Sequence, residues 1–387
     1  MSKKTMIVAA SSIVGILVLL ILFVWLLSAF KKNYTTYENV EEKMILAAKN
    51  YYKTYPDLLP VDEGKYTLQY SALVEGKFIK PLNELLKDGD SCTAEVNVYK
   101  NDIDYDYIPR LYCGENYQTT ELYQKILSEN PVVTEGSGLY QDEHGGYYFR
   151  GKLENVYVSL GSYAKGRNTI EIIWKIMGID ANGNIKIKSL TAFNNKTTYD
   201  NRYNIDTKRY TGYNDFEGSQ LRDFLIKMNN DSIETNSYAL LTNEEKQKLV
   251  PMPLCVGKRK EKSKKNDGSV ECATQTEPLY FGTITPYEFI RASLDENCKK
   301  VNDLSCGNFN YLYDSSTVEL SVTASKTDNY KVYVLNGSTF YLSNANNTKK
   351  VYPTAYINSR VLYRTGDGSK ANPYKLIIKN TSSKKKK

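Results

Sequence analysis

The sequence has little of the chemistry on which most enzyme active sites depend. Among its 387 residues there is one histidine, His144, in the glycine-flanked stretch DEHGG. A serine or cysteine nucleophile of the usual kind needs a histidine base, so catalysis by such a pair is not expected. No P-loop, GxSxG, HExxH or GxGxxG motif stands in a fitting context. A hydrolase built from two carboxylates needs no histidine and stays open among the 44 acidic residues, but we expect a protein that is not an enzyme.

Cysteine spacing typical of a metal site is absent too. None of the six cysteines forms a CxxC motif, and with one histidine a zinc site is not expected, nor is any other metal or cofactor. The cysteines instead fall into three pairs close in sequence: Cys92 with Cys113, Cys255 with Cys272, and Cys298 with Cys306. An even number at short separations predicts disulfides, which persist in an oxidising, extracytoplasmic compartment. Six reduced thiols in a cytoplasmic protein are the alternative.

One long stretch lacks charge altogether. It begins at Met6, ends at Phe30 and has lysines on both sides. About 20 apolar residues suffice for a helix to cross a bilayer, so the stretch predicts a membrane-spanning anchor. A cleaved secretory signal is the alternative, but its hydrophobic centre is shorter, roughly 7–15 residues. Because the flanking lysines are balanced, the orientation depends on the cysteines, and we expect a single-pass cell-membrane protein with residues 33–387 outside.

Tyrosine and lysine are abundant. The 34 tyrosines favour strands and half-exposed surfaces, so we expect much β structure, with most rings used in packing. Part of the net charge of +7 lies in residues 258–265 and 384–387, and both segments are expected to be solvated and flexible. Lysines of this kind could contact acidic lipid headgroups or anionic wall polymers. No nucleic-acid partner is expected for a domain outside the membrane.

The residues after the charge-free stretch have helical spacing. Tyr37, Val40, Met44, Ala47 and Tyr51 would share one face of an amphipathic helix, expected to continue the membrane helix outward as a stalk. Two alternating segments, EVNVYKND and DYIPRLYC, then predict strands stapled by the first cysteine pair. A hydrophobic helix that runs into a small sheet-bearing head resembles the type IV pilins and pseudopilins, over residues 1–120. The chain lacks the glycine cleavage site and the glutamate of a prepilin.

The larger part of the chain alternates strand and helix signals. Strands are expected on both sides of the sequence DANG at residues 180–183, because asparagine and glycine tolerate the positive φ of a tight hairpin. Helices are expected at SQLRDFLIKM and after Thr242 and Thr285, each of which precedes a glutamate by three residues, the spacing of a capping box. Further strands are expected after Cys306.

Several short motifs follow one another in this part. They are GSGLYQDE, IIWKIMGIDANGNIKI, SQLRDFL, LTNEEKQKLV, FGTITPYEFIRAS with the last two cysteines, and VYPTAYINSRVLYRTGDGSKANPYKL. Their order resembles a largely uncharacterised extracellular domain of Gram-positive surface proteins, similar to C-type-lectin-like and sulfatase-modifying-factor folds. The resemblance covers residues 135–378 and implies a ligand-binding or display domain. The family's tryptophan-rich segment is missing, so exposed tyrosines or Trp174 would supply a ligand surface, although the apolar run IIWKIM favours core packing for Trp174.

Together these patterns predict an α+β protein: a single N-terminal transmembrane helix extending into a stalk, a small α+β pilin-like head, and a larger α+β C-type-lectin-like domain. The expected boundaries are a tip and anchor at 1–32, stalk and head at 33–120, a connection at 121–134, the lectin-like domain at 135–378 and a disordered basic tail at 379–387. The expected function is binding, adhesion or display at the cell surface, with a glycan, a wall polymer or a surface protein as partner. A pilin-like structural subunit of a filament or secretion apparatus is the alternative.

Overall fold

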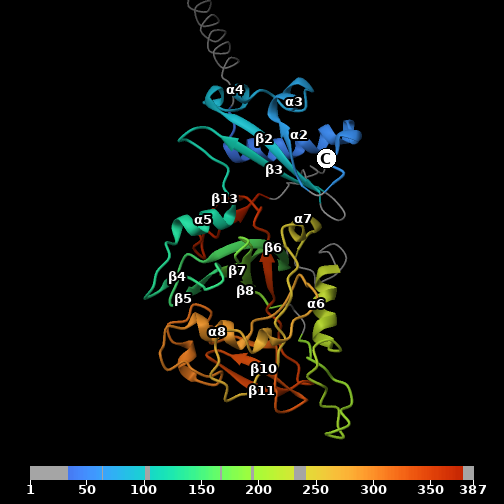
Figure 1. Cartoon of the computed structure of the whole chain (residues 1–387), viewed down its shortest axis with the longest axis vertical. Helices are drawn as coiled ribbons and strands as arrows, with labels where there is room; N and C mark the ends of the chain where they lie inside the picture. Colours follow the sequence, from blue (N-terminus) through green and yellow to red (C-terminus); the bar gives the residue numbers. More distant parts are fainter. Residues whose placement is uncertain are drawn as a thin grey trace, which may run out of the picture. The chain divides into compact units, whose positions relative to one another are not determined.

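The computed structural model of the chain describes residues 34–62, 64–100, 105–165, 168–192, 196–230 and 241–377 (Figure 1). They form two compact units, a smaller one that ends at Thr119 and a larger one that begins at Thr120. The stretch predicted as a membrane anchor and the basic tail both lie outside the described residues. None of the helices in the described ranges is both long and apolar enough to cross a membrane.

The smaller unit is a helix packed against a three-stranded antiparallel sheet of order β1-β2-β3. Its elements, in chain order, are α2 (Tyr37–Thr54), η1 (Pro56–Leu58), β1 (Lys65–Gln69), α3 (Tyr70–Glu75), α4 (Leu82–Leu85), η2 (Gly89–Ser91), β2 (Thr93–Lys100) and β3 (Tyr105–Tyr112). Strands β2 and β3 confirm the two alternating segments predicted from the sequence. Their register places Thr93 opposite Tyr112, so Cys92 and Cys113 meet just beyond the paired residues.

Helix α2 begins at a cap of its own. The backbone of Thr36 is extended (φ −81°, ψ 162°), and its side chain accepts a hydrogen bond from the N–H of Asn39. Val40, Met44 and Ala47, predicted to share one face, are all buried in the core of this unit. The segment expected to be a stalk is therefore a core helix of the smaller unit, because its apolar face packs within that unit.

The larger unit is built mainly from strands. Its largest sheet has the order β12-β8-β7-β5-β4, with β6 paired to β7, and a second sheet has the order β11-β10-β9. The strands are β4 (Gly138–Gln141), β5 (Tyr147–Arg150), β6 (Tyr157–Lys165), β7 (Asn168–Ile179), β8 (Ile185–Ser189), β9 (Val318–Ala324), β10 (Lys331–Asn336), β11 (Thr339–Asn344), β12 (Thr354–Ile357), β13 (Tyr363–Thr365) and β14 (Lys375–Leu376). Strands β13 and β14 form a separate two-stranded sheet.

The helices of the larger unit are short. They are α5 (Leu122–Glu129), α6 (Gln220–Asn230), α7 (Asn243–Lys246), η3 (Glu271–Ala273), α8 (Pro286–Ala292) and η4 (Leu304–Gly307). Both predicted capping boxes are confirmed: Thr242 and Glu245 cap α7, and Thr285 and Glu288 cap α8. In each box the threonine side chain accepts from the glutamate N–H, and the glutamate side chain accepts from the threonine N–H.

The turn between β7 and β8 forms as predicted. One carboxylate oxygen of Asp180 accepts from the N–H groups of Asn182 (2.9 Å) and Asn184 (2.8 Å). Gly183 has a φ of +82°, a conformation that L side chains rarely adopt. The carboxylate of Asp180 is thus used by the turn itself.

The predicted fold class is wrong. The described residues form a mixed α/β structure with mostly strands, spread over several sheets, and they contain no membrane-crossing helix. The helical signals in the larger unit were real but local: α7 spans four residues and α8 seven, so strands carry most of the structure. The expected connection at 121–134, whose sequence ELYQKILSEN allows one helix before Pro131, holds α5, and Leu122 and Ile126 of this helix are buried in the core of the larger unit.

Candidate functional site

All six cysteines pair as the sequence predicts. Disulfides join Cys92 to Cys113, Cys255 to Cys272 and Cys298 to Cys306. No cysteine is left free, so none is available as a thiolate nucleophile or ligand. Disulfides persist in oxidising compartments, and they indicate an extracellular or secreted protein.

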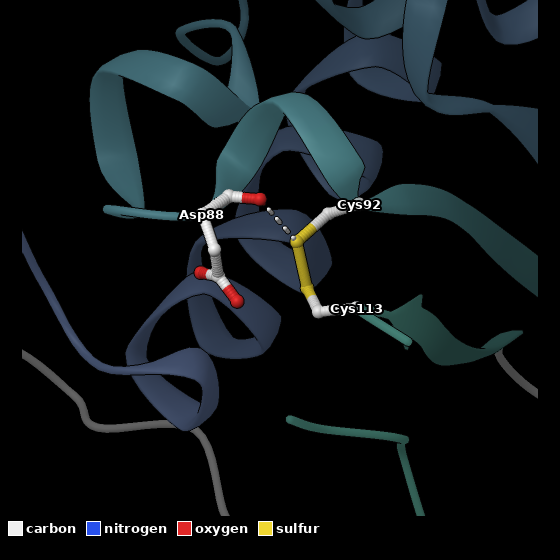
Figure 2. Close-up of side chains that lie close together, drawn as sticks. All are labelled: Asp88, Cys92 and Cys113. Atoms are coloured by element: carbon white, nitrogen blue, oxygen red, sulfur yellow. Dashed lines mark hydrogen bonds between the residues drawn. A yellow bond between two sulfur atoms is a disulfide. The ribbon is translucent and has the colours of Figure 1, made fainter. Parts of the chain in front are cut away.

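One group of side chains in the smaller unit has the composition of a metal site (Figure 2). Asp88, Cys92 and Cys113 bring their possible ligand atoms within 4.8 Å of one another. The two sulfurs are bonded to each other, and one carboxylate oxygen of Asp88 accepts from Tyr37 (2.7 Å) and Asn116 (2.9 Å). The hydrogen bond from Tyr37 is the largest cause of the lowered pKa of Asp88. Without thiolates the group does not fit a metal ion.

Trp174 lies in the core and not on a ligand surface. Its side chain is 0% exposed, and its Nε1 donates to the carbonyl oxygen of Leu160 at 2.7 Å. A hydrogen-bonded indole buried on strand β7 serves packing. A ligand surface has to be sought elsewhere.

A hollow of the larger unit has a volume of about 690 Å³, and four lysines contribute to its lining. Its walls come from residues 214–217, from the segments at 256–263 and 270–275, and from Lys326. Lys258, Lys260, Lys262 and Lys326 supply positive charge, Asp215 and Glu217 supply negative charge, and the apolar side chains of the lining include Phe216 and Val256. The lining of the hollow is therefore partly apolar, and its four lysines outnumber its two carboxylates.

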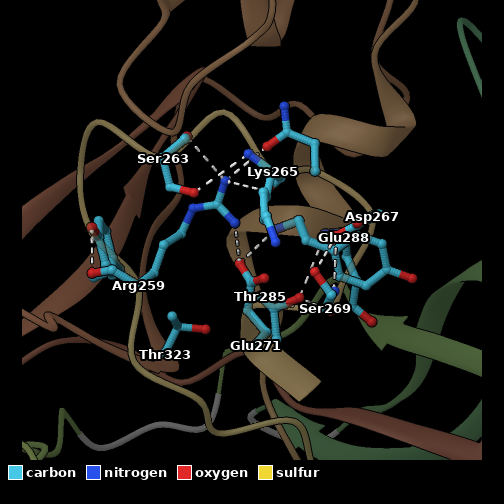
Figure 3. Close-up of polar contacts among 12 residues, drawn as sticks. Arg259, Ser263, Lys265, Asp267, Ser269, Glu271, Thr285, Glu288 and Thr323 are labelled. Carbon is cyan, nitrogen blue, oxygen red and sulfur yellow. Dashed lines mark hydrogen bonds and ion pairs between the residues drawn. The ribbon is translucent and has the colours of Figure 1, made fainter. Parts of the chain in front are cut away.

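A buried arginine fixes the lysine-bearing segment (Figure 3). Arg259 is 0% exposed, and its guanidinium donates to Glu271 (2.9 Å), to the carbonyl oxygen of Lys265 (2.7 Å) and to the side chain of Asn266 (2.7 Å). Its backbone N–H donates to the carbonyl oxygen of Ala324 at 2.8 Å. Residues 258–265 are mostly exposed, as expected of a solvated segment, but Arg259 is buried and ties the segment to the interior.

Alternation along the chain explains why the lysines face the hollow. Around Arg259 the backbone forms a parallel bridge to Ser325, so neighbouring side chains point to opposite sides. Arg259 points inward, whereas Lys258 and Lys260 on either side are exposed. The sequence Lys258-Arg259-Lys260 is compatible with this alternation, but by itself it does not show that Arg259 is the inward residue. Recognising that position requires knowledge of its buried partner, Glu271.

The opposite wall is held close to this segment. Val256 N–H donates to the carbonyl oxygen of Thr274 (2.9 Å), and the Cys255–Cys272 disulfide joins the same two segments. At Gly257 an added Cβ would lie 2.3 Å from the carbonyl oxygen of Val270. Only glycine allows this approach, so the hollow has a defined wall.

Most of the positive charge in the hollow is not neutralised by the protein. Lys258 donates to the side-chain oxygen of Asn214 (2.7 Å), and Glu217 pairs with Arg222 (3.0 Å). In the part of the chain that the structure describes, Lys260, Lys262 and Lys326 form no ion pair. Three unpaired ammonium groups outnumber the two carboxylates of the lining, of which Glu217 already pairs with Arg222, so the hollow has a positive potential that attracts anions.

The buried pair beneath the hollow also contacts helix α8. The Glu271 oxygen that accepts from Arg259 also accepts from the N–H of Tyr287 at 3.3 Å. Burial raises the pKa of the Glu271 carboxyl, and the contact with Arg259 offsets part of that rise. The pair is structural, since both side chains are fully buried and reach no solvent.

Comparison with known proteins adds no identity. No family model, curated protein or solved structure matches the chain, so the resemblances to pilins and to a lectin-like surface domain rest on the sequence motifs alone.

Proposed function

We propose that this is an extracytoplasmic, non-catalytic binding protein whose lysine-lined hollow takes an anionic polymer of the cell surface. Phosphate-bearing and carboxylate-bearing chains share the chemistry that the hollow would recognise. The charge-free stretch from Met6 to Phe30 would hold the protein at the membrane, beside such polymers.

One observation carries the proposal: Lys260, Lys262 and Lys326 have no ion-pair partner among the described residues and lie on segments fixed by the buried Arg259–Glu271 pair. Lysines near an anionic surface gain about 1 kcal/mol each. Because the backbone that carries them is already ordered, less conformational entropy is lost on binding. The apolar side chains of the lining would pack against the uncharged parts of a polymer chain.

The test measures binding of fluorescently labelled polyphosphate to the full-length chain in detergent. Fluorescence polarisation reports the bound fraction. We expect binding that weakens as salt rises, as for exposed charges. The triple variant Lys260→Ala, Lys262→Ala and Lys326→Ala should bind about 100-fold more weakly, the equivalent of roughly 1 kcal/mol per lysine. Polyglutamate in place of polyphosphate distinguishes carboxylate from phosphate recognition, and neutral dextran should not bind.

A matched control removes the same charge elsewhere. Lys264, Lys299 and Lys350 are exposed and do not line the hollow. Their triple alanine variant should bind polyphosphate within about 3-fold of the parent, since only the net charge has changed. If both triple variants lose the same affinity for polyphosphate, binding depends only on the net charge of the protein, and the proposal is contradicted.

A further inference from the structure

A second, smaller cavity of the larger unit is walled by tyrosines. Its volume is about 170 Å³, and its lining comes from β5, the β7–β8 hairpin, helix α8, strand β12 and the residues around Tyr311. Tyr148, Tyr287, Tyr311 and Tyr356 contribute aromatic walls. It shares no lining residue with the lysine-lined hollow.

An arginine side chain lies between two of these rings. The guanidinium carbon of Arg291 is 4.1 Å from the ring centre of Tyr148 and 4.8 Å from that of Tyr287. Stacking on aromatic faces holds a guanidinium in place while its N–H groups, which lie in its own plane, remain available. Within the described ranges, the side chain of Arg291 forms no ion pair and no hydrogen bond.

The other charged groups of the cavity already have partners. Asp142 accepts from the N–H groups of His144 (3.0 Å) and Gly146 (2.8 Å), and Asp180 is used by its turn. Lys186 and Glu288 form an ion pair with each other. Arg291 is thus the one charged side chain of this lining, as far as the structure describes it, that lacks a polar partner.

We infer that this cavity binds the carboxylate of a sugar acid. A guanidinium can hold a carboxylate through two parallel hydrogen bonds. Tyrosine offers an apolar face to pack against a ring and a hydroxyl at its edge. The volume is below the usual range of roughly 300–1,000 Å³ for drug-sized ligands, which restricts the cavity to one ring-sized group. The site is separate from the hollow, so either assignment can fail while the other stands.

The first test is calorimetric titration of the full-length chain with D-glucuronate, with D-glucose as the uncharged match. Glucuronate should bind and glucose should not. Arg291→Gln should weaken glucuronate binding at least 10-fold, whereas Arg209→Gln, an exposed arginine outside both cavities, should leave it unchanged. Polyphosphate binding should be the same in Arg291→Gln as in the parent. Equal binding of glucose, or full binding by Arg291→Gln, would overturn the inference.

A second test uses the unaltered protein and does not depend on a variant that folds. Phenylglyoxal modifies accessible arginines, and mass spectrometry reports the rate at each position. Glucuronate should slow modification of Arg291 and leave that of Arg209 unchanged. If N-acetylglycine protects Arg291 as well as glucuronate does, the ring plays no part and the sugar-acid assignment is wrong. Equal rates with and without glucuronate would also overturn it.

Discussion

The two units bury acidic side chains in different ways. In the larger unit each of Glu271, Glu288 and Glu319 contacts a cation: Arg259, Lys186 and Lys188 respectively. In the smaller unit Glu41 is 0% exposed and contacts the hydroxyl of Thr119, but it forms no ion pair with a described residue. Carboxylate oxygens without a hydrogen bond occur in both units, at Glu41 and at Glu271 and Glu319, so the ion pair is what differs.

The difference teaches what each buried acid does. A buried ion pair seldom adds net stability compared with apolar residues, but it fixes the segments that carry it once both partners are present. Arg259 and Glu271 fix the wall of the hollow, and Glu288 fixes the start of α8. Glu41 forms no ion pair with a described residue, and the charge of Arg110 offsets only a small part of the rise in its pKa that burial causes, so the stability of the smaller unit's core depends on pH.

Arg259→Met should have the largest effect, because it leaves Glu271 buried without a cation. Removing one partner of a buried pair costs about 3–5 kcal/mol. Urea unfolding, monitored through hydrogen exchange of the backbone amides in β9 and β10, should show this loss of stability in the larger unit. The double variant Arg259→Met, Glu271→Gln should regain at least half of it. A single variant as stable as the parent would contradict a structural role for the pair.

Glu41→Gln tests the contrasting acid. Burial is the largest cause of the raised pKa of Glu41, about 7 against an ordinary 4.5. Between these values the folded state binds more protons than the unfolded state, so the stability of the smaller unit should fall as pH rises through this window. The loss should total roughly 3 kcal/mol, at 1.36 kcal/mol per pH unit.

Hydrogen exchange of β2 and β3 at pH 5 and pH 8, corrected for intrinsic rates, measures that loss. The parent should lose protection at pH 8, and Glu41→Gln should not. Glu75→Gln, at an exposed position of the same unit, should behave like the parent. If Glu41→Gln keeps the full pH dependence, another group is responsible and the contrast between the units fails.

The features that could be predicted from the sequence differ from those that could not in how far apart the interacting residues lie along the chain. The β7–β8 turn, both capping boxes and the disulfide pairs are set by residues close in sequence, and all were predicted. The burial of Arg259 was missed because its partners, Glu271 and the end of β9, are 12 and more residues away. The helical spacing of Val40 and Met44 correctly predicted a buried face, but a periodic pattern does not say what covers that face.

The caps of α7 and α8 test whether α8, which contributes to the tyrosine-walled cavity, is a fixed part of the larger unit. Thr285 is 5% exposed and caps α8, whereas Thr242 caps the four-residue helix α7, none of whose residues is buried. Thr285→Ala should cost about 1 kcal/mol, the usual value for a lost cap, and Thr242→Ala less than half of that. Urea unfolding of the larger unit measures both. Equal costs would show that the burial of α8 adds nothing to its cap.

The most direct test of the central claim is lysine labelling of the full-length chain with and without polyphosphate. Acetylation rates read by mass spectrometry report each amine separately. Polyphosphate should slow labelling of Lys260, Lys262 and Lys326 several-fold and leave Lys264, Lys299 and Lys350 unchanged, since only the first three line the hollow. Equal protection of both sets, or none in either, would contradict the assignment of the hollow as the site that binds anionic polymers.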